Sequence, residues 1–401
     1  MISFEESIKI LNNLDFKPIG VQKLFLTDCL GRVLAEDIVA SSNSPEFPTS
    51  GMDGYAIRYE DQKNKKLKIV AKNPAGSKIE REVGRNECIK TFTGSLMPKG
   101  SDTLIPIENV EVEGEFIVIK EEVPKGFSVR AIGENYKKGE VLIKKGSIIS
   151  YPEIGVMGSL NIVMPKVYQK PKVAILATGS EVLEIGQERV NSAQIRSSNS
   201  YTIEAIIKMH GGEPLQFGAV KDDKKSITKA LKEALNSADM VVSTGGVSVG
   251  DYDYVKDVIK DELGAKVAFK GVVIKPGQHI MVAQKGNKPI IGLPGFAYSS
   301  TVTSLVYVLP LLYKLKGSIY RPKIVKATLK EDFIKRSKKT EFSACNVYIE
   351  DGEYFVDFKG KRVGTSAIMT NMLGDVGLLI TSPNEGNKTI GEKVDVWLIK
   401  E

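Results

Sequence analysis

The chain has 401 residues, 42% of them hydrophobic and 26% charged, which is typical of a globular protein of two to four domains. Its net charge of +7 is spread along the sequence, which argues against a nucleic-acid-binding tract and suits an anionic small substrate. Two histidines and three isolated cysteines argue against a histidine-rich metal site, a Ser/His hydrolase and a disulfide framework. A reducing cytoplasm is therefore expected, with neither a signal peptide nor a membrane-spanning segment.

The first 170 residues combine short elements with many turn signals. Residues 3–40 predict a helix followed by a short apolar segment, and residues 41–130 have the short alternating runs of a small β domain. The clearest strand candidates are residues 67–71, 88–92 and 116–120. A further apolar helix is predicted over residues 153–159, and the sequence near residues 168–171 indicates a domain boundary.

From residue 172 the pattern changes to alternating strands and helices. This alternation predicts a doubly wound, mostly parallel sheet. The predicted strands cover residues 173–177, 215–220, 240–243, 267–274 and 289–293, and the helices cover residues 201–210, 254–263 and about 298–313, with another helix capped by Asp222 or Asp223. After Arg321 the pattern returns to strands, with a hairpin at Asp351 and Gly352 and a last strand at residues 394–399.

The loop STGGVSVGDYDY at residues 243–254 is the most informative segment. It lies between an apolar run and a helical pattern, where glycines let backbone N–H groups approach a phosphate. Asp251 and Asp253 would supply oxygen ligands for Mg²⁺. A loop whose aspartate only caps a helix explains the same spacing. The loops at residues 178–181 and 292–295 also follow strands, so the three loops are expected to share one rim of the sheet, which favours a phosphate pocket.

Several motifs occur in the order known from one family. They are PEFPTSGMDGYA at residues 45–56, FTGSLMPKGSDT at 92–103, LATGSE at 176–181, GGVSVGDYD at 245–253, IKPG at 274–277 and GLPG at 292–295. With these motifs the chain resembles, over residues 3–400, the molybdopterin molybdenumtransferases. These are cytoplasmic enzymes that insert molybdenum into adenylylated molybdopterin, and related domains occur in gephyrin.

The resemblance implies a multidomain fold of α/β plus β type and a homodimer. The expected parts are a helical or mixed N-terminal dimerisation domain (residues 1–40 and 131–170), an inserted β domain (41–130), a doubly wound α/β molybdopterin-binding domain (171–320) and a C-terminal β-barrel (321–401). The active cleft would lie between the α/β domain of one subunit and the β domain of its partner.

The resemblance also implies roles for residues of the motifs. Catalysis is expected from Asp53, Asp253, Lys270 and Lys275, and binding of Mg²⁺ from Asp53, Glu181 and Asp253. The residues expected to bind the pterin substrate or an oxyanion are Thr93, Glu181, Asp223, Gly245, Gly246, Ser248, Gly250, Pro294, Ser299 and Ser366. The residues alone leave other roles open, because Asp53 fits a turn, Asp223 fits a helix cap and the two lysines fit solvated strand ends.

The implied reaction brings two anions together. Molybdate exchanges oxygens for the dithiolene sulfurs of the pterin, and cleavage of the phosphoanhydride releases AMP. Mg²⁺ and lysines would lower the repulsion and hold the reacting groups close to each other.

Some positions depart from the family pattern and keep alternatives open. Gln278 stands where lysine is common, Phe296 and Ala297 stand where Asn-Pro is common, and Ala344 stands where arginine is common. Lost arginine matters because its planar fork binds anions in a bidentate way. The alternatives are a divergent paralogue that handles tungstate, a non-catalytic pterin-binding or scaffold protein, and a pterin adenylyltransferase that consumes ATP. The extra β domains argue against the last of these.

Overall fold

The computed structural model describes residues 1–78, 80–246 and 254–399. The chain divides into two compact units. The larger unit contains Met1–Glu36, Gly146–Ile154 and Met164–Glu401, and the smaller contains Asp37–Lys145 and Gly155–Val163. The four domains expected from the sequence stay a prediction beside this division.

The smaller unit is built on a mostly antiparallel sheet with the strand order β7-β4-β6-β5-β9-β8. Its strands are β4 (Gly54–Ile57), β5 (Lys66–Asn73), β6 (Glu87–Thr91), β7 (Thr103–Pro106), β8 (Val110–Glu113) and β9 (Phe116–Ile119). Tyr55, Leu67, Ile105 and Ile117 pack together in its core. The three strand candidates of this region are thus confirmed. Two short ladders complete the unit, β2 (Ile38–Val39) with β11 (Val141–Ile143) and β3 (Thr49–Ser50) with β10 (Val129–Arg130).

The α/β sheet of the larger unit has the strand order β16-β13-β17-β21-β20-β18. Its strands are β13 (Lys172–Thr178), β16 (Glu213–Val220), β17 (Met240–Thr244), β18 (Lys266–Lys270), β20 (Met281–Lys285) and β21 (Lys288–Leu293). The first four strands in the sheet are parallel, and β20 and β18 are antiparallel to their neighbours. The predicted mostly parallel sheet is therefore confirmed.

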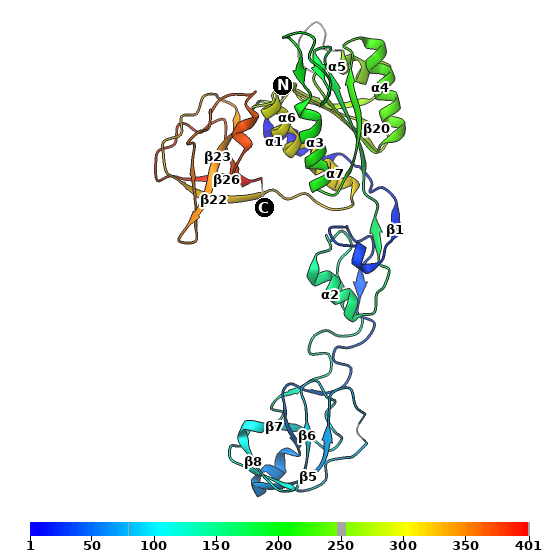
Figure 1. The fold of residues 1–401 in the computed structure, drawn as a ribbon, viewed down its shortest axis with the longest axis vertical. Coiled ribbons are helices and arrows are strands. Elements are labelled where there is room, and N and C mark those ends of the chain that lie inside the picture. The colour runs from blue at the N-terminus through cyan, green and yellow to red at the C-terminus, as the bar shows by residue number, and fades with distance from the viewer. Residues whose placement is uncertain (79, 247–253, 400–401) are drawn as a thin grey trace. The chain divides into compact units, whose positions relative to one another are not determined.

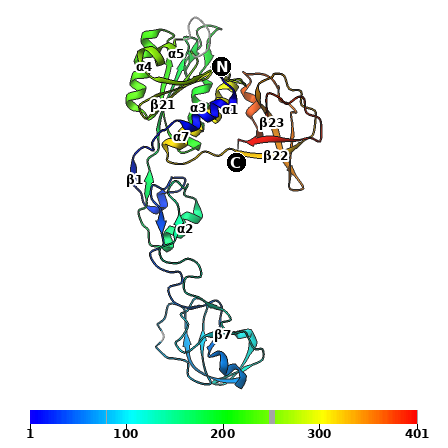
Figure 2. The ribbon, with the colours of Figure 1, turned by 180° about the vertical axis from the view of Figure 1, so that it is seen from behind.

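Helices cover both faces of this sheet (Figures 1 and 2). One face packs against α3 (Ser198–Met209), α6 (Ala297–Thr303) and α7 (Leu309–Leu315), and the other against α4 (Lys224–Ser237) and α5 (Val255–Asp257). Strand β13 shows why. Val173 and Ile175 belong to the first core, and Ala174 and Leu176 to the second, because successive side chains of a strand point to opposite faces.

The stretch 267–274, predicted as one strand, is two strands in different sheets. Strand β18 ends at Lys270, and Gly271 follows with a φ of 71°. This left-handed conformation, which glycine adopts without strain, turns the chain out of the α/β sheet. Strand β19 (Ile274–Lys275) then pairs with β23 of the C-terminal sheet. Strand β20, which was not predicted, forms a hairpin with β21 through Gly286.

The C-terminal region forms a closed five-stranded barrel, as predicted. The order β23-β24-β22-β26-β25 closes because β23 pairs again with β25. Its strands are β22 (Lys323–Leu329), β23 (Thr340–Glu350), β24 (Glu353–Asp357), β25 (Val376–Thr381) and β26 (Lys393–Leu398). Asp351 and Gly352 both have positive φ, 49° and 82°, which suits the tight turn of the predicted β23–β24 hairpin.

Two further α-helices are α1 (Phe4–Asn13), which packs against the first core, and α2 (Tyr151–Ser159), which crosses the boundary between the two compact units. Two further strand pairs are β1 (Val21–Lys23) with β12 (Lys166–Tyr168), and β14 (Val182–Leu183) with β15 (Ile195–Arg196). Within the described residues, no helix has the length and apolar character needed to cross a membrane.

The buried Lys316 should make the stability of the larger unit depend on pH. Its side chain is buried, its Nζ donates to the His210 carbonyl at 2.6 Å, and burial lowers its pKa to about 8, with Arg32 and Lys170 adding to the effect. Between that pKa and the ordinary lysine value the unfolded chain binds more protons, so the folded state gains stability as pH rises. We expect the free energy of unfolding of wild type minus that of Lys316→Met to rise by about 2 kcal/mol between about pH 7 and pH 9.5. Urea unfolding of both proteins measures this, and a difference that stays constant with pH would contradict it.

Candidate active site

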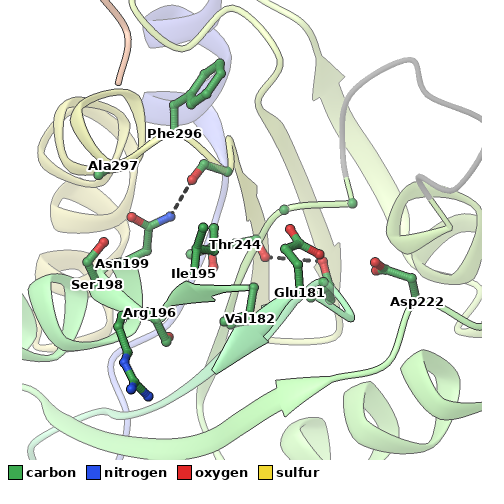
Figure 3. A pocket seen from close by; sticks show the side chains of 17 residues that line it. Glu181, Val182, Ile195, Arg196, Ser198, Asn199, Asp222, Thr244, Phe296 and Ala297 are labelled. Atoms are coloured by element: carbon green, nitrogen blue, oxygen red, sulfur yellow. Dashed lines mark hydrogen bonds between the residues drawn. The ribbon is translucent and has the colours of Figure 1, made fainter. Parts of the chain in front are cut away.

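A cavity of about 400 Å³ lies where the parallel strands of the α/β sheet end (Figure 3). Its wall includes Thr178 at the end of β13, Thr244 at the end of β17, Asp222 after β16 and Gly295 after β21. The carboxyl ends of parallel strands are where ligands of such sheets bind. The sequence prediction that these loops share one rim is thus confirmed for the described residues.

Two glycines after β17 form one wall and have no room for side chains. Gly245 and Gly246 have φ values of 83° and 66°. A Cβ on Gly245 would lie 2.7 Å from the Thr178 carbonyl oxygen, and one on Gly246 would lie 2.5 Å from a methyl group of Val255. Backbone is therefore exposed to the cavity at this point, as the predicted phosphate loop requires. The rest of that loop, with Ser248, Gly250, Asp251 and Asp253, lies outside the described residues.

Two carboxylates, Glu181 and Asp222, line the cavity. The backbone N–H of Ser180 donates to Asp222 at 3.2 Å, which ties the loop after β13 to the loop after β16. The neighbouring Asp223, predicted to bind substrate, instead caps α4. It accepts from the Ser226 N–H at 2.8 Å, and the Ser226 side chain and N–H lower its pKa. The sequence left open which aspartate caps the helix, and the structure gives that role to Asp223 and the cavity position to Asp222.

Several cavity residues were not predicted from the sequence. Asn199, in the first turn of α3, donates from Nδ2 to the Gly295 carbonyl at 2.7 Å and so links two walls (Figure 3). Arg196 and Ser198 also line the cavity, and Arg196 donates to the Glu184 carbonyl at 3.1 Å. The only sequence signal was a run of small polar residues, 197–200, at the beginning of a helix. The partner carbonyl is 96 residues away, so nothing local indicated the contact.

The other predicted residues of the larger unit lie outside this cavity. Lys270 is exposed at the end of β18, and Pro294 is not part of the cavity wall. Lys275 lines a narrow recess at the barrel, where its Nζ lies 3.8 Å from Oε1 of the buried Glu341.

Ser299 and Ser366 were predicted together, and the structure brings them together. The N–H and the hydroxyl of Ser299 both donate to the Ser366 carbonyl, at 3.1 and 3.2 Å. Ser299 is buried and belongs to α6, whereas Ser366 is in the barrel region. The contact joins the two parts of the larger unit near Gly277, whose Cβ would lie 3.5 Å from the Ser299 carbonyl oxygen.

In the smaller unit the structure brings the predicted residues Asp53 and Thr93 together. Both the N–H and the hydroxyl of Thr93 donate to Oδ1 of Asp53, at 2.8 and 2.7 Å. The backbone hydrogen bond first, and the hydroxyl second, lower the pKa of Asp53, so its carboxylate is charged at neutral pH. The next residue, Gly54, has no room for a side chain, because a Cβ there would lie 2.3 Å from the Ile105 carbonyl oxygen.

Over residues 1–78, 80–246 and 254–399 there is no cluster of three or more His, Cys, Asp or Glu side chains placed to hold a metal ion. The two cavity carboxylates, Glu181 and Asp222, still match the way Mg²⁺ binds in phosphate-handling sites. There it takes one or two carboxylates and completes its shell with water and substrate phosphate oxygens.

Comparison with known proteins decides the family. A profile described as "MoeA N-terminal region (domain I and II)" matches residues 2–160, and one described as "Probable molybdopterin binding domain" matches residues 174–314. The chain belongs to the molybdopterin molybdenumtransferase family. The predicted family, fold class and enzyme class are therefore confirmed.

Individual relatives cover most of the chain. A molybdopterin molybdenumtransferase from Haemophilus influenzae is 31% identical over 97% of this chain and 96% of its own length. One from Nostoc sp. is 34% identical over 81% of this chain and 76% of its own length. The crystal structure of the molybdopterin biosynthesis moeA protein from Pyrococcus horikoshii OT3 is 29% identical and has a TM-score of 0.84, covering 99% of this chain and 100% of that chain.

The hydrogen bonds to Asp53 predict the effect of one substitution. Thr93→Val removes the hydroxyl donor and keeps the backbone N–H, so the pKa of Asp53 should rise toward its ordinary value without returning to it. A carboxyl-carbon NMR titration of wild type and variant measures the shift. Thr91→Val is the matched control, because the Thr91 hydroxyl donates to the Ile89 carbonyl instead. An Asp53 pKa that is unchanged in Thr93→Val would contradict the assignment.

Proposed function

We propose that this protein inserts molybdenum, taken from molybdate, into adenylylated molybdopterin and releases AMP. The observation that carries the proposal is the cavity at the rim of the α/β sheet, where two glycines and two carboxylates meet within a molybdopterin-binding family domain. Family membership supports the transfer reaction, and the chemistry of the cavity supports an adenylylated substrate. Exposed backbone at Gly245 and Gly246 suits a phosphate group.

The proposed cofactor is Mg²⁺, held by Glu181 and Asp222 together with phosphate oxygens of the substrate. When bound, it would neutralise phosphate charge and so lower the repulsion between substrate and oxyanion. Asp53 and Asp253 keep their predicted roles of positioning metal or water at the phosphoanhydride. The geometry of Asp53 supports its role, because two hydrogen bonds from Thr93 orient its carboxylate and favour the charged form.

The oxyanion is proposed to bind near the barrel, beside Lys275, Ser299 and Ser366. The contact between the two serines gives this region a fixed backbone. A quarter of the Lys275 side chain is exposed, and its Nζ lies 3.8 Å from Oε1 of the buried Glu341. Lys270, at its exposed position, would act only by long-range attraction of anions.

We also propose a homodimer in the cytoplasm. Large apolar side chains are exposed in the first and second segments of the larger unit, on Val21, Phe25, Leu30, Ile148 and Tyr151. Gly31 donates its N–H to the Ile149 carbonyl, which keeps these two segments adjacent. Such exposed apolar groups suit burial against a second copy. The partner's β domain would bring Asp53 to the cavity. The three cysteines are free, which suits a reducing compartment.

The chain's departures from the family pattern favour one alternative, a pterin-binding protein without transfer activity. Gln278 is engaged with Lys339 through its Oε1 and with His279 at 2.8 Å, so it does not replace the missing lysine charge. Ala344 is buried and donates its N–H to the Tyr298 hydroxyl at 2.9 Å. Ala344 thus leaves a neutral group where arginine is common, whereas the ammonium group of Lys339 supplies positive charge beside Gln278. Use of tungstate in place of molybdate is the other alternative.

The reaction itself is tested by measuring AMP release and bound metal. Purified protein is incubated with adenylylated molybdopterin and Mg²⁺, with molybdate, with tungstate or with neither. We expect AMP release that depends on Mg²⁺ and on one oxyanion, with that metal retained in the pterin, and loss of turnover in Asp53→Ala. Tight pterin binding without AMP release would instead support the non-catalytic alternative, and full turnover of Asp53→Ala would remove that residue from the mechanism.

Two adjacent aspartates provide a matched pair of variants. Asp222→Ala removes a carboxylate from the cavity, and we expect at least about a tenfold loss of AMP release, partly recovered by raised Mg²⁺ concentration. Asp223→Ala removes the cap of α4 and should lower the free energy of unfolding by about 1 kcal/mol while the folded enzyme keeps its rate. Steady-state kinetics and urea unfolding on both variants check this. Equal losses of rate in the two variants would contradict the assignment of Asp222 to the cavity and Asp223 to the helix cap.

A further inference from the structure

Phe296 lies at the rim of the cavity, and packing within the protein does not explain why an aromatic side chain stands there. It follows Gly295 directly, lines the cavity, and is 64% exposed. In the described part of the chain no other aromatic ring packs against it. The ring therefore contributes little to the protein's own core.

The helix that begins here does not explain the ring either. Phe296 is the N-cap residue of α6, with a φ of −71° and a ψ of 132°, and makes no side-chain capping bond. Small polar residues stabilise this position because their oxygen accepts from a helix N–H, which phenylalanine cannot do. The aromatic ring of Phe296 therefore does not stabilise the beginning of α6, which points to a role outside the helix.

The backbone on both sides of the ring is anchored. Asn199 donates to the Gly295 carbonyl at 2.7 Å, and the Ser300 N–H donates to the Phe296 carbonyl at 2.8 Å. These two bonds hold the main chain that carries the ring. Because its backbone is already fixed, the Phe296 ring loses little conformational freedom when a ligand packs against it, which favours binding.

The cavity has chemically different sides (Figure 3). Phe296 and Ala297 lie on one side, with the Phe296 ring at the outer edge of the site, and the carboxylates of Glu181 and Asp222 lie on another. A ligand that matches both sides has a flat apolar ring at one end and a phosphate, with its metal ion, at the other. A nucleotide or a pterin phosphate has this composition.

We propose that Phe296 binds the substrate by stacking on a flat bicyclic heterocycle, which is the adenine or the pterin ring of adenylylated molybdopterin. This role rests on the proposed function, since it takes its ligand from that reaction. It makes Phe296 a residue that determines affinity for the ring and takes no part in the bond changes. Stacking of a base on an aromatic side chain is sequence-tolerant and stronger than contact with an aliphatic group of similar size.

The test compares ligands with and without a ring. Isothermal titration calorimetry in the presence of Mg²⁺ measures the affinity of the full-length protein for AMP, ribose 5-phosphate and molybdopterin. Phe296→Leu keeps an apolar side chain without the ring, Phe296→Tyr keeps the ring, and Phe116→Leu is the matched control. Phe116 is also exposed, at 37%, lies on β9 of the smaller unit and is not part of the cavity wall.

We expect Phe296→Leu to weaken AMP binding about fivefold and to leave ribose 5-phosphate binding unchanged, with Phe296→Tyr and Phe116→Leu close to wild type. A loss confined to molybdopterin would support stacking and identify the pterin as the ring. Equal losses for AMP and ribose 5-phosphate, or no loss for either ring, would overturn the proposal, as would failure of wild type to bind both rings.

These outcomes are separate from those of the transfer reaction. Oxyanion-dependent AMP release by wild type, together with wild-type affinities in Phe296→Leu, would remove only the stacking role. Ring-dependent binding without AMP release would remove only the transfer reaction.

Discussion

The structure of the candidate site depends on the close approach of two backbone segments at the rim of the α/β sheet. Gly245 and Gly246 leave β17 with positive φ, and the first of them passes so near the Thr178 carbonyl that a methyl group would collide with it. This approach leaves room for a cavity bounded by backbone on one side and by carboxylates on another. A side chain at either glycine would collide with Thr178 or Val255 and push this backbone out of the position in which a phosphate is proposed to meet it.

The rim is rigid because the sheet beneath it is buried on both faces. Alternate residues of β13 belong to two different cores, so neither face can shift without disturbing packed side chains. The loops after β13, β16 and β17 therefore start from fixed points, and hydrogen bonds such as Ser180 to Asp222 join them. The proposed chemistry asks for this, because two anions react only when they are held close together and their charge is offset.

Much of the fold was predictable because its signals are local. The apolar runs of β13 and β17, and the turn at Asp351 and Gly352, each specify an element from a few adjacent residues. The predictions that were wrong or missing concern features set by contacts between residues far apart in the sequence. The stretch 267–274 divides because β19 pairs with the barrel strand β23. In the site, the glycine loop and Glu181 were predictable from motifs, but the role of Asn199 rests on a carbonyl far along the chain. Asp222 and Asp223 differ by one position of a helix cap, which sequence alone does not resolve.

A crystal structure of the protein with AMP and Mg²⁺ shows whether the rim cavity binds the nucleotide end of the substrate. We expect the phosphate to lie against the backbone of Gly245 and Gly246, and Mg²⁺ to be held by the carboxylates of Glu181 and Asp222. AMP bound elsewhere on the protein, or a cavity that stays empty at saturating AMP, would show that the nucleotide end does not bind there.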